Sequence, residues 1–109
     1  MKVDVFKKAI EIYGADMQLN VAIEEFSELT KEICKYKRGS KNIPNIIEEI
    51  ADCYIMLSQL QIIFNLDFTE IAEWVDKKVE RLKGRLKDNT FTEIKHNSLC
   101  ETETFEGRC

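Results

Sequence analysis

The sequence predicts an all-α fold: a compact four-helix arrangement with antiparallel neighbours and a non-helical or poorly ordered C-terminal tail. Apolar residues recur at helical spacing as far as about residue 87, and no stretch alternates apolar and polar residues long enough to form a sheet. The breaks between the apolar segments are short, as they are between antiparallel helices. We therefore divide the 109 residues into a helical domain, 1–88, and a polar tail, 89–109.

The first two helices are predicted on either side of a glycine. The first ends at Gly14 and rests on four apolar residues at helical spacing: Val3, Phe6, Ile10 and Tyr13. The second has Asp16 or Asn20 as its cap and ends at the turn "KRGSKN". Its apolar stripe consists of Ala22, Phe26, Leu29, Ile33 and Tyr36.

The third and fourth helices are predicted from a proline and a second apolar stripe. Pro44 fits the first turn of a helix that runs to about Phe64. The second half of this helix, "CYIMLSQLQIIF", is apolar nearly all round, which indicates burial on every side. Three other helices are too few to cover it, so we expect a homodimer or a dimer of dimers. The fourth helix covers about 67–87, on Phe68, Ile71, Val75, Leu82 and Leu86.

Composition excludes several classes of partner. The net charge of −4 gives no overall attraction to nucleic acid or to an anionic membrane surface, and we expect neither as a partner. No apolar run approaches the roughly 18 residues of a membrane span, and the N-terminus lacks the apolar core of a signal peptide. The four cysteines show no CxxC spacing, which favours reduced thiols and a cytoplasmic protein.

Two stretches, "AIEEFSELTKEI" and "NIIEEIADCYIM", carry matched pairs of acids. On helical wheels, Glu25 and Glu28 lie at the same angle to their apolar stripe as Glu49 and Asp52 do to theirs. Antiparallel packing of the two helices through these stripes would bring four carboxylates together at one edge. Two carboxylates about 4 Å apart repel by roughly 4 kcal/mol at an effective dielectric constant of 20, so such a cluster binds protons or a cation. Oxygen ligands favour Mg²⁺, with Mn²⁺ as the alternative.

A single ExxE on a helix is ordinarily a solvent-exposed face, but two pairs matched in angle on consecutive helices favour a site. Several known classes of acid-rich site do not fit this chain. A ferritin-like di-iron bundle needs ExxH motifs, and the single histidine, His96, lies in the tail. Metal-dependent HD phosphohydrolases need several histidines, and the glycine-led loop and helix of a Nudix motif is missing.

The spaced acids resemble the signature of the MazG-like all-α nucleotide pyrophosphohydrolases. The likeness consists of ExxE at Glu25-Phe-Ser-Glu28 and, about 20 residues later, ExxD at Glu49-Ile-Ala-Asp52. It extends to the doubled "EE" before each pair, the basic turn "KYKRG" and the basic fourth helix. Relatives of that family include dimeric dUTPases, dCTP pyrophosphatases and phosphoribosyl-ATP pyrophosphohydrolases. The last usually carry Tyr-His after ExxD, whereas this chain has "CYIM", which argues against that branch.

The resemblance implies hydrolysis of a nucleoside triphosphate to the monophosphate and pyrophosphate, in the manner of a nucleotide-pool house-cleaning enzyme. Glu25, Glu28, Glu49 and Asp52 would be the catalytic residues that hold Mg²⁺ while water attacks the α-phosphorus. It also implies dimers or dimers of dimers with sites near the interface. Further acids that could orient water or ligands are Glu24, Glu32 and Glu48.

Substrate contacts are predicted mainly on the fourth helix. Lys78, Arg81 and Arg85 fall within about 60° of one another and form a cationic stripe suited to phosphates. Where the family often has Asn, four residues after the lysine, this chain has Leu82, so contacts made by that residue are not carried over. Four residues are candidates for a base contact, although each is of a type that more often serves as a core or cap residue: Gln18, Tyr13, Tyr36 and Trp74. Of these we select Gln18.

Two other functions fit the same helices. A helical protein-binding adaptor could use the apolar third helix, and a non-catalytic nucleotide sensor could use the acids without turnover. An adaptor has no use for four converging carboxylates, so this cluster separates the adaptor from the enzyme.

Overall fold

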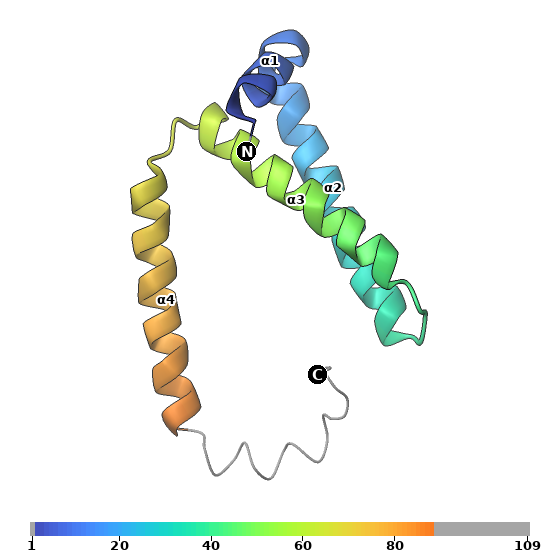
Figure 1. Cartoon of the computed structure of the whole chain (residues 1–109), viewed down its shortest axis with the longest axis vertical. Coiled ribbons are helices and arrows are strands. Elements are labelled where there is room, and N and C mark those ends of the chain that lie inside the picture. Colours follow the sequence, from blue (N-terminus) through green and yellow to red (C-terminus); the bar gives the residue numbers. More distant parts are fainter. Residues whose placement is uncertain (1, 89–109) are drawn as a thin grey trace. The chain divides into compact units, whose positions relative to one another are not determined.

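The computed structural model describes residues 2–88, which form four α-helices: α1 (Val3–Tyr13), α2 (Ala15–Lys37), α3 (Ile43–Ile63) and α4 (Phe68–Asp88) (Figure 1). No strand occurs among these residues, so the predicted all-α class is confirmed. The predicted tail, 89–109, lies outside the described residues. The chain divides into two units, Met1–Phe68 and Thr69–Cys109, and α4 is therefore described by itself.

The start of α2 differs from the prediction. The helix begins at Ala15, directly after Gly14, and neither Asp16 nor Asn20 caps it. Gly14 has a φ of 91°, a conformation that favours glycine, so the chain changes direction within one residue. Its N–H donates to the Ile10 carbonyl at 2.8 Å, closing α1. A single glycine thus ends one helix and begins the next, which makes a side-chain cap unnecessary.

A residue with positive φ also follows the cap of each of the next two helices. Gly39, with a φ of 105°, follows α2, and the N–H of Ser40 reaches back to the carbonyl of Lys35 at 3.1 Å. Asn65 takes the same place after α3 with a φ of 52°. Both ends satisfy carbonyls that the helix leaves without partners. The chain after Gly39 returns α3 antiparallel to α2, side by side with it (Figure 1).

The core of the first unit is small and partly polar. Its buried apolar residues are Phe6, Ala22, Cys53 and Met56, and its buried polar residues are Gln18, Glu32 and Gln59. Helix α1 packs on both α2 and α3, but the main contact is between α2 and α3. The core thus contains three buried polar side chains beside four apolar ones. Hydrogen bonds between the polar side chains therefore influence the packing, as does the burial of apolar surface.

The face through which α2 and α3 pack is rotated toward the acids relative to the prediction. Ile33 and Tyr36, expected in the contact, are 46% and 40% exposed, and Leu57 on α3 is 50% exposed. The small residues Ala22, which was expected in the contact, and Cys53 are buried. They let the two backbones approach closely, and the Cys53 thiol donates to the Glu25 carbonyl at 3.7 Å. The acids therefore lie nearer the contact than its edge.

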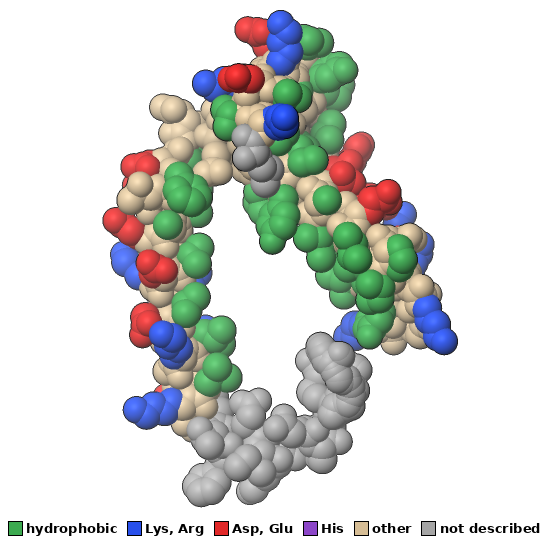
Figure 2. Space-filling model, viewed as in Figure 1, with side chains coloured by type: hydrophobic (Ala, Val, Ile, Leu, Met, Phe, Trp, Pro, Cys, Tyr) green, Lys and Arg blue, Asp and Glu red, His purple; other side chains and the backbone are tan. Residues whose placement is uncertain are grey.

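The opposite side of α3 presents an apolar stripe, which we call the outer face of α3. Its members are all exposed. They follow one another at spacings of four and three residues in turn, apart from the last, which directly follows the helix: Ile43, Ile47, Ile50, Tyr54, Leu57 and Phe64. Figure 2 shows hydrophobic side chains following α3 and, separately, α4. The helix is thus apolar beyond its contact with α2, and along more of its length than the second half for which the sequence predicts this.

Helix α4 is amphipathic. Its apolar stripe is Ile71, Val75, Val79, Leu82 and Leu86, and its remaining surface is largely charged. Within residues 2–88 no helix combines the length and apolar character needed to cross a membrane.

Candidate metal centre

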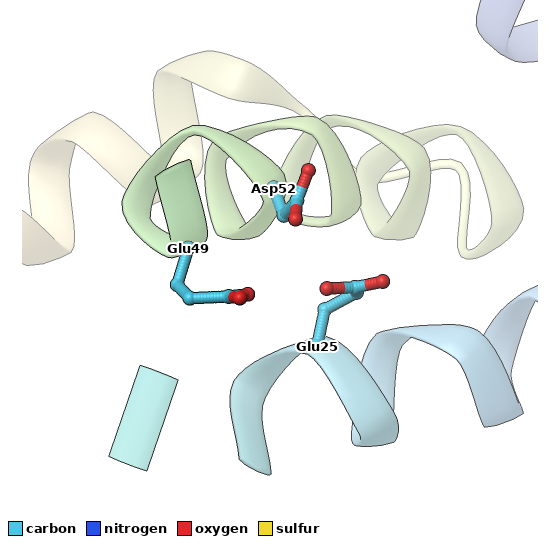
Figure 3. A group of neighbouring side chains, drawn as sticks. All are labelled: Glu25, Glu49 and Asp52. Atoms are coloured by element: carbon cyan, nitrogen blue, oxygen red, sulfur yellow. The ribbon is translucent and has the colours of Figure 1, made fainter. Parts of the chain in front are cut away.

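Three carboxylates from two helices meet between α2 and α3. Glu25 comes from α2, and Glu49 and Asp52 come from α3 (Figure 3). One oxygen of each lies within 4.8 Å of the others. All three residues are half-buried. The predicted convergence of acids from two helices is therefore present for these three.

Local sequence explains the arrangement. Glu49 and Asp52 are three residues apart and so share one face of α3. Glu25 lies opposite them on α2. Its backbone carbonyl accepts a hydrogen bond from the thiol of Cys53, the residue after Asp52. The side chains then project into the same space from the two helices, as Figure 3 shows.

The electrostatics show a cluster that lacks positive charge. Burial raises the pKa of Glu25, and the charge of Asp52, a hydrogen bond to it and the charges of Glu49 and Glu28 raise it further. Burial also raises the pKa of Glu49, followed by the charges of Asp52 and Glu28. Among the described residues, Glu49 Oε1 is buried and has no hydrogen-bond partner. Such a cluster is stabilised by a proton or a cation.

Glu28, the fourth predicted ligand, lies at the edge of this cluster. Its side chain is 45% exposed, and its Oε1 forms an ion pair with Lys31 at 3.3 Å. Its carboxylate is outside the group of three, although its charge raises the pKa of both Glu25 and Glu49. The local charge balance explains this placement, because Lys31 offers Glu28 the compensation that the three central acids lack.

Glu32, one of the acids that could orient water or ligands, is engaged elsewhere. It is only 5% exposed, accepts a hydrogen bond from Asn42 Nδ2 at 2.6 Å and pairs with Lys35 Nζ at 3.2 Å. The hydrogen bond from Asn42 is the largest influence on its pKa, which is lowered. The other two such acids, Glu24 and Glu48, are exposed. Glu32 is thus a compensated carboxylate that joins α2 to the start of α3.

Gln18 also has a partner inside the helix pair. It is 7% exposed, and its Nε2 donates to Oε1 of Gln59 at 2.7 Å. Its contact with a base stays a prediction. The sequence alone did not identify Gln59 or Asn42 as partners. The available signal was a spacing of seven residues. Gln59 lies seven residues after Asp52, and Asn42 lies seven residues before Glu49, so each falls on the same side of the helix as its acid.

The predicted phosphate-binding residues lie on α4, in the second unit. Lys78 and Arg81 flank the Trp74 ring, with charged centres 5.8 and 6.0 Å from its centroid, and Lys77 lies at 4.6 Å. Arg85 lies one turn beyond Arg81. These distances are those of cation–π contacts between neighbouring turns. The helical wheel predicted the cationic stripe but not its arrangement around the tryptophan, which the spacings of three, four and seven residues indicate.

The chain finds no match among protein-family models, curated proteins or solved structures. The resemblance to the MazG-like enzymes therefore rests on the residues themselves.

Proposed function

We propose that the protein is a Mg²⁺-dependent nucleoside triphosphate pyrophosphohydrolase. The observation that carries this proposal is the cluster of Glu25, Glu49 and Asp52, whose neighbours raise rather than lower the pKa of Glu25 and Glu49. The buried Oε1 of Glu49 has no hydrogen-bond partner within residues 2–88 and is therefore open to bind the same cation. An all-oxygen donor set fits Mg²⁺ first and Mn²⁺ second.

Each acid has a role in this proposal. Glu25, Glu49 and Asp52 hold the cation between α2 and α3, and Glu28, one turn from Glu25, joins as the fourth ligand. Mg²⁺ bound there supplies positive charge to the triphosphate and to the water that displaces pyrophosphate. Because the three central acids already lie together between two packed helices, they need little rearrangement on binding, whereas Glu28 would have to leave its ion pair with Lys31.

The substrate in this proposal is a triphosphate. Lys78, Arg81 and Arg85 bind its phosphates, because guanidinium and ammonium groups form strong charge-assisted hydrogen bonds to phosphate oxygens. The products are a nucleoside monophosphate and pyrophosphate, and the role is house-cleaning of the nucleotide pool. Cys34 and Cys53 are free thiols, which fits a cytoplasmic enzyme.

The outer face of α3 supports a second element of the proposal, self-association. Six exposed apolar side chains along one helix are typical of a surface that another protein covers. We propose a homodimer or a dimer of dimers. The same face favours the alternative function, a helical adaptor, but an adaptor leaves the carboxylate cluster without a use.

The test is a panel of canonical and modified nucleoside triphosphates, incubated with the protein and Mg²⁺ or Mn²⁺ and assayed for pyrophosphate and monophosphate. We expect equal amounts of the two products from at least one triphosphate, and none in EDTA. Orthophosphate in place of pyrophosphate, or no release from any member with either metal, overturns the proposal. Calorimetric binding of a triphosphate without turnover would identify a nucleotide sensor instead.

A further inference from the structure

The contact between α2 and α3 contains three polar layers. We call them the glutamine layer (Gln18 and Gln59), the carboxylate layer (Glu25, Glu49 and Asp52) and the Glu32–Asn42 layer. On α2, Gln18, Glu25 and Glu32 follow one another at intervals of seven residues; on α3, seven residues separate Asn42 from Glu49 and Asp52 from Gln59. Seven residues are close to two turns, about 10.5 Å along a helix. The layers therefore lie on one face of each helix at equal intervals.

The two outer layers are joined by amide hydrogen bonds, although Asn42 Oδ1 has no partner in the described part of the chain. The middle layer has a hydrogen bond between the carboxyls of Glu25 and Asp52 but, among these same residues, no cationic side chain or amide to offset its charges. Gln18 and Gln59 are 7% and 5% exposed and share a hydrogen bond of 2.7 Å. Asn42 Nδ2 donates to both the side chain and the backbone carbonyl of Glu32, at 2.6 and 2.9 Å. In the carboxylate layer, by contrast, the acids repel one another.

This contrast bears on the register of α2 against α3. Apolar contacts are non-directional, so they allow one helix to shift along the other at little cost. The repulsion within the carboxylate layer favours such a shift. A buried amide or carboxylate has its partner in one register only, and buried polar residues fix register in other paired helices. The outer layers therefore oppose the movement that the middle layer favours.

We propose that Gln18–Gln59 and Glu32–Asn42 are positioning pairs that hold α2 and α3 in the register where Glu25 meets Glu49 and Asp52. In this role the pairs act through the positions of the helices and not through contact with the cation. The proposal that this register serves metal binding rests on the proposed function. The effect of the pairs on the register does not depend on it.

The register is tested without metal by removing the glutamine layer. In Gln18→Leu/Gln59→Leu, two apolar side chains of similar size replace the hydrogen-bonded amides. Nitroxides at the exposed positions Thr30 and Glu48 report the separation of α2 and α3 by double electron–electron resonance. The other native cysteines are replaced, and Cys53 is kept because it is buried and its thiol contacts Glu25. We expect one narrow distance for the parent protein and a broadened or displaced distribution for the double variant. The matched control is Met56→Leu, a volume-conserving change in the same contact, which should keep the parent distance.

The consequence for the site is tested with Mn²⁺, whose binding is followed by electron paramagnetic resonance. Loss of residues that orient metal ligands commonly weakens binding by about 10- to 100-fold, and we expect a loss in this range for the double variant. Met56→Leu should bind as the parent does. If Gln18 and Gln59 had a merely structural role, the double variant could be less stable, but its Mn²⁺ affinity would equal that of Met56→Leu.

Asn42→Ala provides a second route should the leucine pair fail to fold, because it removes the Glu32–Asn42 layer and leaves the glutamine layer intact. We expect the same broadening and the same loss of Mn²⁺ affinity. An unchanged distance distribution in a folded variant overturns the inference, as does a displaced distribution with parental Mn²⁺ affinity. A parent protein that binds no Mn²⁺ overturns the proposed metal site instead, while the distances still decide the register.

Discussion

The two faces of α3 reverse the usual distribution of polarity. The face toward α2 carries Glu49, Asp52 and Gln59, whereas the outer face of α3 carries six exposed apolar side chains. An amphipathic helix ordinarily buries its apolar face and exposes its charges. The inner face also carries the buried apolar residues Cys53 and Met56, so polar partners from α2 and apolar packing both contribute to it. The apolar residues of the outer face require cover from another surface.

A second contrast exists within the inner face. Glu49 and Glu32 both lie between α2 and α3, yet the pKa of Glu49 is raised and that of Glu32 is lowered. Burial raises the pKa in both cases. Asn42 and Lys35 reverse this effect for Glu32, while Glu49 has further acids beside it. The partners supplied by the opposite helix and the next turn therefore determine which glutamate has its charge compensated and which does not.

The largest effect is expected from Glu49→Gln on the inner face. The change removes one charge at nearly constant shape, so the metal-free protein should be as stable as the parent or more stable. Pyrophosphate release should fall by at least about 100-fold, because a metal ligand supplies several kcal/mol of transition-state stabilisation. We also expect millimolar Mg²⁺ to raise the melting temperature of the parent protein, and this rise should disappear in the variant.

Glu70→Gln is the control for this variant, because Glu70 lies on α4 outside the matched pairs. It should retain both turnover and the Mg²⁺ shift. Lower metal-free stability of Glu49→Gln together with full turnover would make the carboxylate layer a structural feature and remove the basis for the enzyme.

The next effect concerns the outer face. The parent should sediment as a dimer or larger at micromolar concentration. Leu57→Lys should weaken self-association by at least about tenfold, since it places a charge within the apolar stripe. Thr30→Lys adds the same charge on an exposed part of α2 and should leave association unchanged. A monomeric parent would show that the outer face of α3 is not a self-association surface.

A smaller effect distinguishes the two kinds of glutamate by pH. In EDTA, the folded protein should bind more protons than the unfolded chain at Glu25 and Glu49, so the free energy of unfolding should fall as pH rises from the ordinary value of 4.5 through their raised pKa values. Glu32 acts in the opposite direction: its stabilising effect is present above 4.5 and is lost as pH falls through its lowered pKa.

Urea denaturation across this pH range measures both effects. In Glu49→Gln, the free energy of unfolding should fall less as pH rises above 4.5. In Glu32→Gln, it should fall less as pH decreases below 4.5. Mg²⁺ should reduce only the first of these losses. Equal changes in the two variants would mean that the carboxylate layer and the Glu32–Asn42 layer do not differ in charge compensation.

The smallest effect is expected at the tail. Truncation after Asp88 removes residues 89–109, which contribute none of the predicted ligands or phosphate contacts. Metal-dependent turnover should change by less than about twofold, within the range of surface changes remote from a site. A truncated protein that folds and assembles but lacks activity would assign the tail a catalytic or substrate-binding role.

The helices and the acid pairs were predictable because they depend on local rules. Gly14 and Pro44 mark helix ends through their own backbone preferences, and Glu49 and Asp52 share a face through spacing alone. The rotation of the α2–α3 contact toward the acids was not predictable in this way. It depends on which small and polar residues meet across two helices, as Ala22, Cys53 and the Gln18–Gln59 pair do, and the periodicity of one helix holds no information on its register against another.

The burial of Cys53 has a kinetic consequence. This thiol is 7% exposed and follows Asp52 directly, and burial is the largest cause of its raised pKa, whereas Cys34 on α2 is exposed. Iodoacetamide should therefore alkylate Cys34 in the folded protein but reach Cys53 only during excursions that separate α2 from α3. The labelling rate of Cys53 relative to that in the unfolded chain gives the free energy of this local opening. A bound cation should slow the labelling of Cys53 and leave that of Cys34 unchanged.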